Sequence, residues 1–176
     1  MATTKWVLDP THSEIGFKVK HMMFSNVSGK FQQFTATIAA DDDNFENAEV
    51  EFSAETASIT TGNADRDKHL MSADFFDAEK HPQIAFKSVS FTKEGEDVYH
   101  LKGNLTLHGI SKPVSLVAEF GGIAQDPWGN TKAAFSVSGK LNRKDWGLNW
   151  NAALEAGGVL VSDEVRLEIE LQFVKQ

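Results

Sequence analysis

The sequence contains no cysteine among its 176 residues. This absence excludes disulfides, thiolate catalysis and cysteine metal ligands, so the core must be stable without covalent cross-links. The chain also lacks any apolar run approaching the about 18 residues of a membrane-spanning helix. A chain of this length can bury a sizeable core, and we expect residues 1–176 to form a single domain.

Basic residues are too few to balance the acidic ones, 17 against 25, and the formal net charge is -8. Nucleic-acid affinity depends largely on Lys and Arg releasing counterions, so the sequence predicts no nucleic-acid partner. The first ten residues, MATTKWVLDP, contain no apolar run of the about 7 to 15 residues found in a secretory signal. The sequence as written therefore predicts a cytoplasmic protein, or a periplasmic one if a preceding signal has been removed.

Motifs for catalysis and metal binding are missing. No GxSxG, HxH or HExxH pattern occurs, and the six histidines (His12, His21, His69, His81, His100 and His108) are not spaced as metal ligands. His12 and Ser13 cannot form a dyad on a strand, because neighbouring side chains point to opposite faces. We therefore predict no cofactor and no metal, and keep catalysis as the second hypothesis.

Alternation of apolar and polar residues is the clearest pattern in the chain. Residues 164–173, EVRLEIELQF, place apolar side chains on one face and polar ones on the other. Comparable segments at 15–19, 34–38, 49–54, 84–91, 99–107, 114–120 and 133–141 bring the predicted total to about eight strands. Short turns, such as the acidic run at 41–43, favour antiparallel pairing. Eight such strands can close into a barrel or pack as two sheets, and the pattern leaves both open.

Two connections are too long for hairpin turns, at residues 57–81 and 142–162, and long ordered loops often carry function. The first predicts a short helix over residues 65–72 with Asn63 as its N-cap. The second contains an apolar cluster of Trp146, Leu148, Trp150 and Leu154.

The aromatic residues are mostly phenylalanine, 13 against a single tyrosine. An interior lined by phenyl rings suits a ligand with few hydrogen-bonding groups, such as a lipid. The alternative is that these rings simply fill the barrel, as buried aromatic residues usually do.

Residues 60–88 read TTGNADRDKHLMSADFFDAEKHPQIAFKS and combine a TG pair, RDxHL, FFD and a strand that starts at proline. In the same order, the chain carries Trp6, DPTHS at 9–13, HM at 21–22, GKF at 29–31, LTLHG at 105–109, KPV at 112–114 and RKDWGL at 143–148. This set resembles the YceI-like family, the lipocalin-like polyisoprenoid-binding proteins, over nearly the whole chain.

The resemblance implies an all-β fold, an eight-stranded antiparallel lipocalin-like barrel with a short helix and two long loops. It also implies a noncatalytic carrier of an isoprenoid-type amphiphile, either a polyprenyl lipid or an isoprenoid quinone, and a homodimer. Two other classes stay open: a lipid-modifying enzyme that uses the barrel as a substrate tunnel, and a protein-interaction module with a filled core.

We predict that the lipid tail contacts apolar residues on the strands and loops: Phe17, Val19, Phe34, Phe52, Leu70, Phe75, Phe76, Phe86, Leu105, Leu107, Phe135, Trp146, Leu148 and Trp150. The candidates for the polar head are His21, Arg66 and His69. His21 continues the inward parity of the 15–19 strand. Arg66 has a second interpretation, in which it and Asp67 bind each other and the loop backbone and so fix the loop.

Overall fold

The computed structural model describes residues 3–22, 25–151 and 161–176. In this part of the chain the strands are β1 (Thr4–Leu8), β2 (Glu14–His21), β3 (Ser25–Phe31), β4 (Phe34–Asp41), β5 (Asn44–Glu55), β6 (Ile59–Thr60), β7 (Gln83–Gly95), β8 (Val98–Leu107), β9 (Ile110–Gln125), β10 (Thr131–Asn142) and β11 (Val161–Lys175). Helix α1 (Ala64–Met71) and three short 3-10 segments, η1 (Pro10–His12), η2 (Thr56–Ser58) and η3 (Arg143–Trp146), complete the fold.

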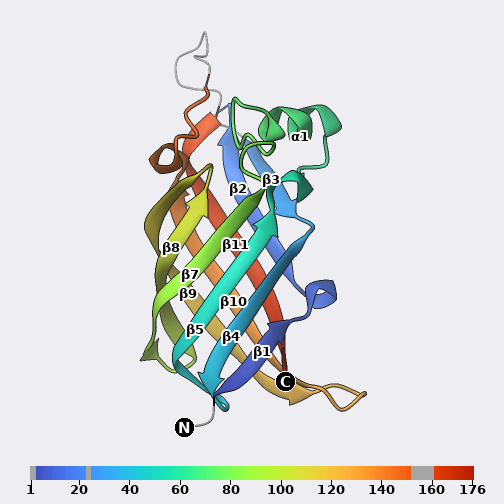
Figure 1. The fold of residues 1–176 in the computed structure, drawn as a ribbon, viewed down its shortest axis with the longest axis vertical. Coiled ribbons are helices and arrows are strands. Elements are labelled where there is room, and N and C mark those ends of the chain that lie inside the picture. The colour runs from blue at the N-terminus through green and yellow to red at the C-terminus, as the bar shows by residue number, and fades with distance from the viewer. Residues whose placement is uncertain (1–2, 23–24, 152–160) are drawn as a thin grey trace.

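The sheet closes on itself through β11. One edge of β11 pairs with β10 along almost its whole length. The other edge pairs with two strands. The C-terminal end of β11 pairs with β1, where Trp6 faces Lys175, and the earlier part of β11 pairs with β2, where Ile15 faces Ile169. All pairs are antiparallel, so the strands form a closed barrel, as Figure 1 shows.

Three of the eight strand positions in the barrel are each occupied by two consecutive strands. β1 and β2 follow one another across η1, β3 continues into β4, and β5 continues into β6 across η2. β1 pairs with β4 while β2 pairs with β3, so each pair of short strands acts as one strand of the barrel. The predicted eight-stranded antiparallel barrel is therefore confirmed.

The sequence pattern missed β1 and β3. β1 has only five residues. β3 has Gly29 at a position that faces Phe17 across the pair, so its apolar alternation is interrupted where a core side chain would be expected.

The turns have the predicted chemistry. The β8–β9 turn contains His108 and Gly109 with φ of 53° and 74°, and these positive values are typical of a two-residue hairpin turn. Asp42 has φ of 54° in the exposed β4–β5 turn. Such turns reverse the chain without crossovers and keep neighbouring strands antiparallel.

The two ends of the barrel differ, as Figure 1 shows: α1 lies at one end and both chain termini lie at the other. The helix was predicted over residues 65–72 and occupies 64–71, with the Arg66 backbone N–H donating to Asn63 Oδ1 at 3.1 Å. The predicted N-cap is therefore confirmed. None of the described helices is long and apolar enough to cross a membrane.

Aromatic rings fill the interior near the termini. We call Trp6, Phe45, Phe91, Tyr99, Phe120 and Phe135 the aromatic plug. The ring of Phe135 meets that of Phe45 edge-on at 5.1 Å between centroids, and Phe45 lies 5.2 Å from Trp6. Trp6 and Phe45 have no exposed surface, so this end of the barrel is packed as a core.

A partly buried ion pair fixes the break between β1 and β2. Lys132 Nζ on β10 donates to Asp9 Oδ2 at 2.8 Å, and the two side chains are only 19% and 17% exposed. Asp9 Oδ1 also accepts from the Thr11 backbone N–H at 3.1 Å. The hydrogen bond from Lys132, helped by those from Thr11 and His12, holds the pKa of Asp9 well below its usual value of 3.8.

We predict that Asp9→Asn lowers the free energy of unfolding by about 1.5 to 3 kcal/mol at neutral pH, the scale of a hydrogen bond to a charged group. A lowered folded-state pKa stabilises the protein above the unfolded pKa, so the difference from wild type should shrink as the pH falls below about 4. Urea unfolding at a series of pH values measures it. Asp43→Asn, which removes an exposed partner of Lys175, is the matched control and should cost at most about 1 kcal/mol.

Candidate functional site

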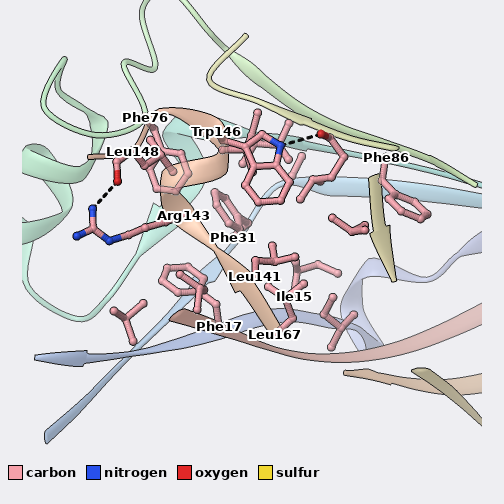
Figure 2. A pocket seen from close by; sticks show the side chains of 18 of the residues that line it. Ile15, Phe17, Phe31, Phe76, Phe86, Leu141, Arg143, Trp146, Leu148 and Leu167 are labelled. Atoms are coloured by element: carbon pink, nitrogen blue, oxygen red, sulfur yellow. Dashed lines mark hydrogen bonds between the residues drawn. The ribbon is translucent and has the colours of Figure 1, made fainter. Parts of the chain in front are cut away.

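The half of the barrel nearer α1 contains a cavity of about 340 Å³. Ligand sites of small molecules span about 300 to 1,000 Å³, so the cavity is large enough for one. Its wall is mostly aliphatic and phenyl side chains from the strands, from α1 and from the two long loops. Figure 2 shows Phe17, Phe31 and Phe76 turned toward the same space, with 5.9 Å between the first two rings and 6.2 Å between the second and third.

Most of the residues predicted to contact a lipid tail border this cavity: Phe17, Val19, Phe52, Leu70, Phe75, Phe76, Phe86, Leu105, Leu107, Trp146, Leu148 and Trp150. The three head-group candidates, His21, Arg66 and His69, border it too. The residues predicted from many separate segments of the sequence thus lie together around one cavity. That these side chains contact a ligand stays a prediction.

Two predicted wall residues lie elsewhere. Phe135 is 3% exposed and belongs to the aromatic plug, so its ring is packed against other rings. Phe34 packs against the core at the start of β4, and Phe31, on the other side of the β3–β4 break, borders the cavity in its place. For Phe135 the cause is that inward parity fixes the face of a strand but not the level along the barrel.

Two glycines leave space for phenyl rings beside the cavity. A Cβ at Gly29 would overlap Phe17 Cζ, so this ring lies flat over the glycine of the neighbouring strand. Gly103 provides the same space beneath the ring of Phe86. A larger side chain at either glycine would push a ring toward the cavity.

The two long loops meet at the end of the cavity that α1 covers. His69, from α1, meets Trp150 of the second loop edge-on, with 4.7 Å between ring centroids. Phe75 lies 5.1 Å from His69 and 5.3 Å from Trp150. His69 Nε2 lies 2.9 Å from Asp74 Oδ2, which fixes the imidazole. These three rings join the loops across the cavity. Leu154 lies outside the described residues.

Arg66 and Asp67 both bind Thr61. Arg66 donates from Nε to Thr61 Oγ1 at 2.7 Å and from Nη2 to Thr61 O at 2.8 Å. Asp67 Oδ1 accepts from the Thr61 backbone N–H at 2.8 Å. The predicted anchoring to the loop is present, whereas no ion pair joins Arg66 to Asp67 in the described structure. Within it, Arg66 Nη1 has no hydrogen-bond partner.

The polar side chains around the cavity are cationic or neutral. Lys20, His21, Arg66, His69 and Arg143 border it, and no carboxylate from the described ranges does, although the net charge of the chain is -8. The His21 side chain has no hydrogen-bond partner among the residues that the structure describes. The cavity therefore offers donors, and no negative charge, to a polar group.

Arg143 is a wall residue that the sequence analysis did not single out. Its side chain is 5% exposed, and Nε donates to Ser162 O at 2.9 Å while Nη1 donates to Leu148 O, as Figure 2 shows for the second bond. Asp163 lies 3.9 Å from Nη2. Burial lowers the pKa of Arg143 and Asp163 opposes this, yet arginine stays protonated. Arg143 thus ties the start of the second loop to β11. The RKDWGL motif was the available signal.

Hydrogen bonds fix Trp146 in the cavity wall. Its Nε1 donates to Leu105 O at 2.9 Å, and His108 Nδ1 lies 2.9 Å from the Trp146 carbonyl. Trp146 and Leu148 are 2% and 6% exposed. These two side chains of the apolar loop cluster are therefore covered inside the protein and give no reason for pairing. The homodimer stays a prediction from the family resemblance.

The histidines do not gather into a metal site. In the described parts of the chain, no group of three or more His, Asp or Glu side chains is arranged to hold a metal ion. His12 lies beside Asp9, His100 lies 2.6 Å from Glu94, and His81 meets His108 edge-on.

Comparisons with known sequences point to one family. The family model described as the YceI-like domain matches residues 6–173. A UPF0312 protein of Pectobacterium atrosepticum is 39% identical over 175 residues, covering 99% of this chain and 88% of the relative. Protein YceI of Salmonella newport is 38% identical over 165 residues, covering 94% and 83%.

Solved structures share the fold. The YCEI protein of Campylobacter jejuni is 33% identical with a TM-score of 0.75, covering 89% of this chain and 90% of that one. BcnA of Burkholderia cenocepacia has a TM-score of 0.79 at 22% identity, covering 94% and 98%. A polyisoprenoid binding domain from Saccharophagus degradans has a TM-score of 0.70 at 13% identity, covering 97% and 98%.

We predict that Phe135→Ala costs about 3 to 5 kcal/mol of unfolding free energy, because it leaves a hole in a packed cluster. Phe17→Ala removes the same atoms from a half-buried ring that borders the cavity, and should cost clearly less. Chemical denaturation of lipid-free protein compares the two. Equal losses would show that Phe135 is no better packed than a wall residue.

Proposed function

Because the chain belongs to the YceI-like family, we propose that it binds a long-chain isoprenoid-type amphiphile, a polyprenyl lipid or an isoprenoid quinone, and carries it without chemical change. The observation that carries the proposal is the almost entirely apolar cavity in the half of the barrel nearer α1. The Saccharophagus degradans domain with the same fold is a polyisoprenoid binding domain, which supports this class of ligand.

The chemistry of the wall suits a hydrocarbon tail. Each buried CH₂ group contributes about 0.8 kcal/mol, so a five-carbon prenyl unit formally gives about 3 to 4 kcal/mol. Realised affinities of larger ligands approach about 0.3 kcal/mol per atom, so a few units suffice for useful binding. The cavity also contradicts the alternative in which aromatic rings fill the whole interior.

The polar groups at the wall suit an electron-rich head. A quinone carbonyl or a phosphate accepts hydrogen bonds, and His21 and Lys20 supply donors with no carboxylate beside them on the described wall. Charge-assisted bonds of this kind are roughly twice as strong as neutral ones. In the proposed complex, the head lies on the α1 side and the tail points toward the plug.

We predict that the protein co-purifies with lipid from bacterial expression. Native mass spectrometry followed by organic extraction detects it. Added long-chain isoprenoid at about 100 times Kd should stabilise delipidated protein by about 2.7 kcal/mol, which raises Tm by roughly 5 to 10 °C. Finding only lipid-free protein, with no rise in Tm on addition, would contradict the carrier function. Chemical turnover of the bound lipid would favour the enzyme.

We also predict that His21 and Arg66 respond differently to the head group. His21→Ala should weaken binding of a headed isoprenoid by about 0.5 to 1.5 kcal/mol, because His21 is free to donate to it, and spare a headless hydrocarbon of equal length. Arg66→Ala frees Thr61 and loosens α1, so both ligands should lose affinity and Tm should fall. Calorimetric titration compares them. A selective loss for the headed ligand in Arg66→Ala would assign Arg66 to the head group instead.

A further inference from the structure

The interior of the barrel is divided at one level. On β8, Leu101 borders the cavity while Tyr99, the next inward residue toward the termini, belongs to the aromatic plug. On β10, Val137 borders the cavity while Phe135 belongs to the plug. On these two strands, aliphatic cavity lining gives way to packed rings at this level.

Phe173 on β11 lies at the boundary. It borders the cavity, is 1% exposed, and its ring centroid is 6.3 Å from that of Phe135. Phe135 in turn lies 5.1 Å from Phe45 and 5.2 Å from Phe120. A ligand atom that moved past Phe173 would therefore have to displace rings that are held on several sides.

We propose that Phe173, supported by Phe135, is the floor of the lipid site and sets the length of tail that the barrel can hold. The inference rests on the proposed carrier function and adds a specificity-determining residue to it. Short and long isoprenoids differ only in repeated five-carbon units, so a fixed floor distinguishes them by the number of units that can be covered.

The depth of the cavity sets how many carbons of a lipid tail can fit inside it. Residues 165–173 of β11 follow the wall, and at about 3.3 Å per residue with a strand tilt of about 40° they span roughly 20 Å along the barrel axis. An extended carbon chain advances about 1.3 Å per bond of about 1.5 Å. A prenyl unit has four bonds along the chain and one methyl branch, so it advances about 5 Å and the roughly 20 Å hold about four units, close to twenty carbons. Further units extend beyond the cavity.

The test is a ladder of prenols from the ten-carbon to the forty-carbon alcohol, titrated against delipidated full-length protein by calorimetry or by competition with a fluorescent fatty acid. Up to about twenty carbons, each unit should tighten binding roughly tenfold, as five atoms at the usual ligand efficiency imply. Beyond that length, we expect less than a threefold gain per unit.

Two variants move the floor in opposite directions. Val137→Phe places a ring in the cavity one level above Phe135, so the break in the ladder should move to chains shorter by about one unit. Phe173→Leu removes part of the floor and should move the break to longer chains. Val117→Phe is the matched control, because Val117 is 39% exposed on the outer face of β9 and should leave the ladder unchanged.

The outcomes separate the two proposals. Wild-type affinity that keeps rising tenfold per unit up to forty carbons would leave the carrier function intact and overturn the floor. An unchanged break in a folded Val137→Phe variant would do the same. Absence of binding at every length would overturn the carrier function and the floor together.

Discussion

Closure of the barrel through the two-sided pairing of β11 is the constraint on which the rest of the structure depends. Once the sheet is closed, every second residue must point into an interior whose width is set by the strand number and tilt. The chain cannot widen this space. It can only choose which side chains occupy it at each level, and that choice separates a packed core from a ligand cavity.

The inward side chains differ between the two ends of the barrel. Near the termini, the rings of Phe45 and Phe91 pack against that of Phe135. Nearer α1, aliphatic and phenyl side chains line a cavity, and Gly29 and Gly103 leave space for the rings of Phe17 and Phe86. One closed sheet thus combines a packed core at one end with a cavity at the other.

The sequence predicts the features of this fold that depend on local spacing. Period-two alternation located most strands, and the cap at Asn63 located α1, because both signals lie within a few residues. It failed where the answer depends on distant pairing. Phe135 and Val137 have the same parity, yet only register with other strands places one in the plug and the other at the cavity.

Polar residues of the site were predicted less completely than apolar ones, for a related reason. Arg66 was recognised from its motif, but its bonds to Thr61, which anchor it to the loop, depend on folding and were not visible in the sequence. Arg143 binds backbone carbonyls of Leu148 and Ser162, which carry no side-chain signature in the sequence. A buried arginine that binds carbonyls is indistinguishable, in sequence, from one on the surface.

The cavity itself has a thermodynamic consequence for the carrier function. An unfilled apolar space of about 340 Å³ leaves its lining side chains without part of their dispersion contacts, which costs stability relative to a packed interior. In the ligand-free protein, the aromatic plug and the contacts that join the two long loops offset this cost. A hydrocarbon tail that fills the space restores the missing dispersion contacts, so binding and folding are linked. In the proposed carrier, the same unfilled space that weakens the free protein therefore contributes to the affinity for the tail.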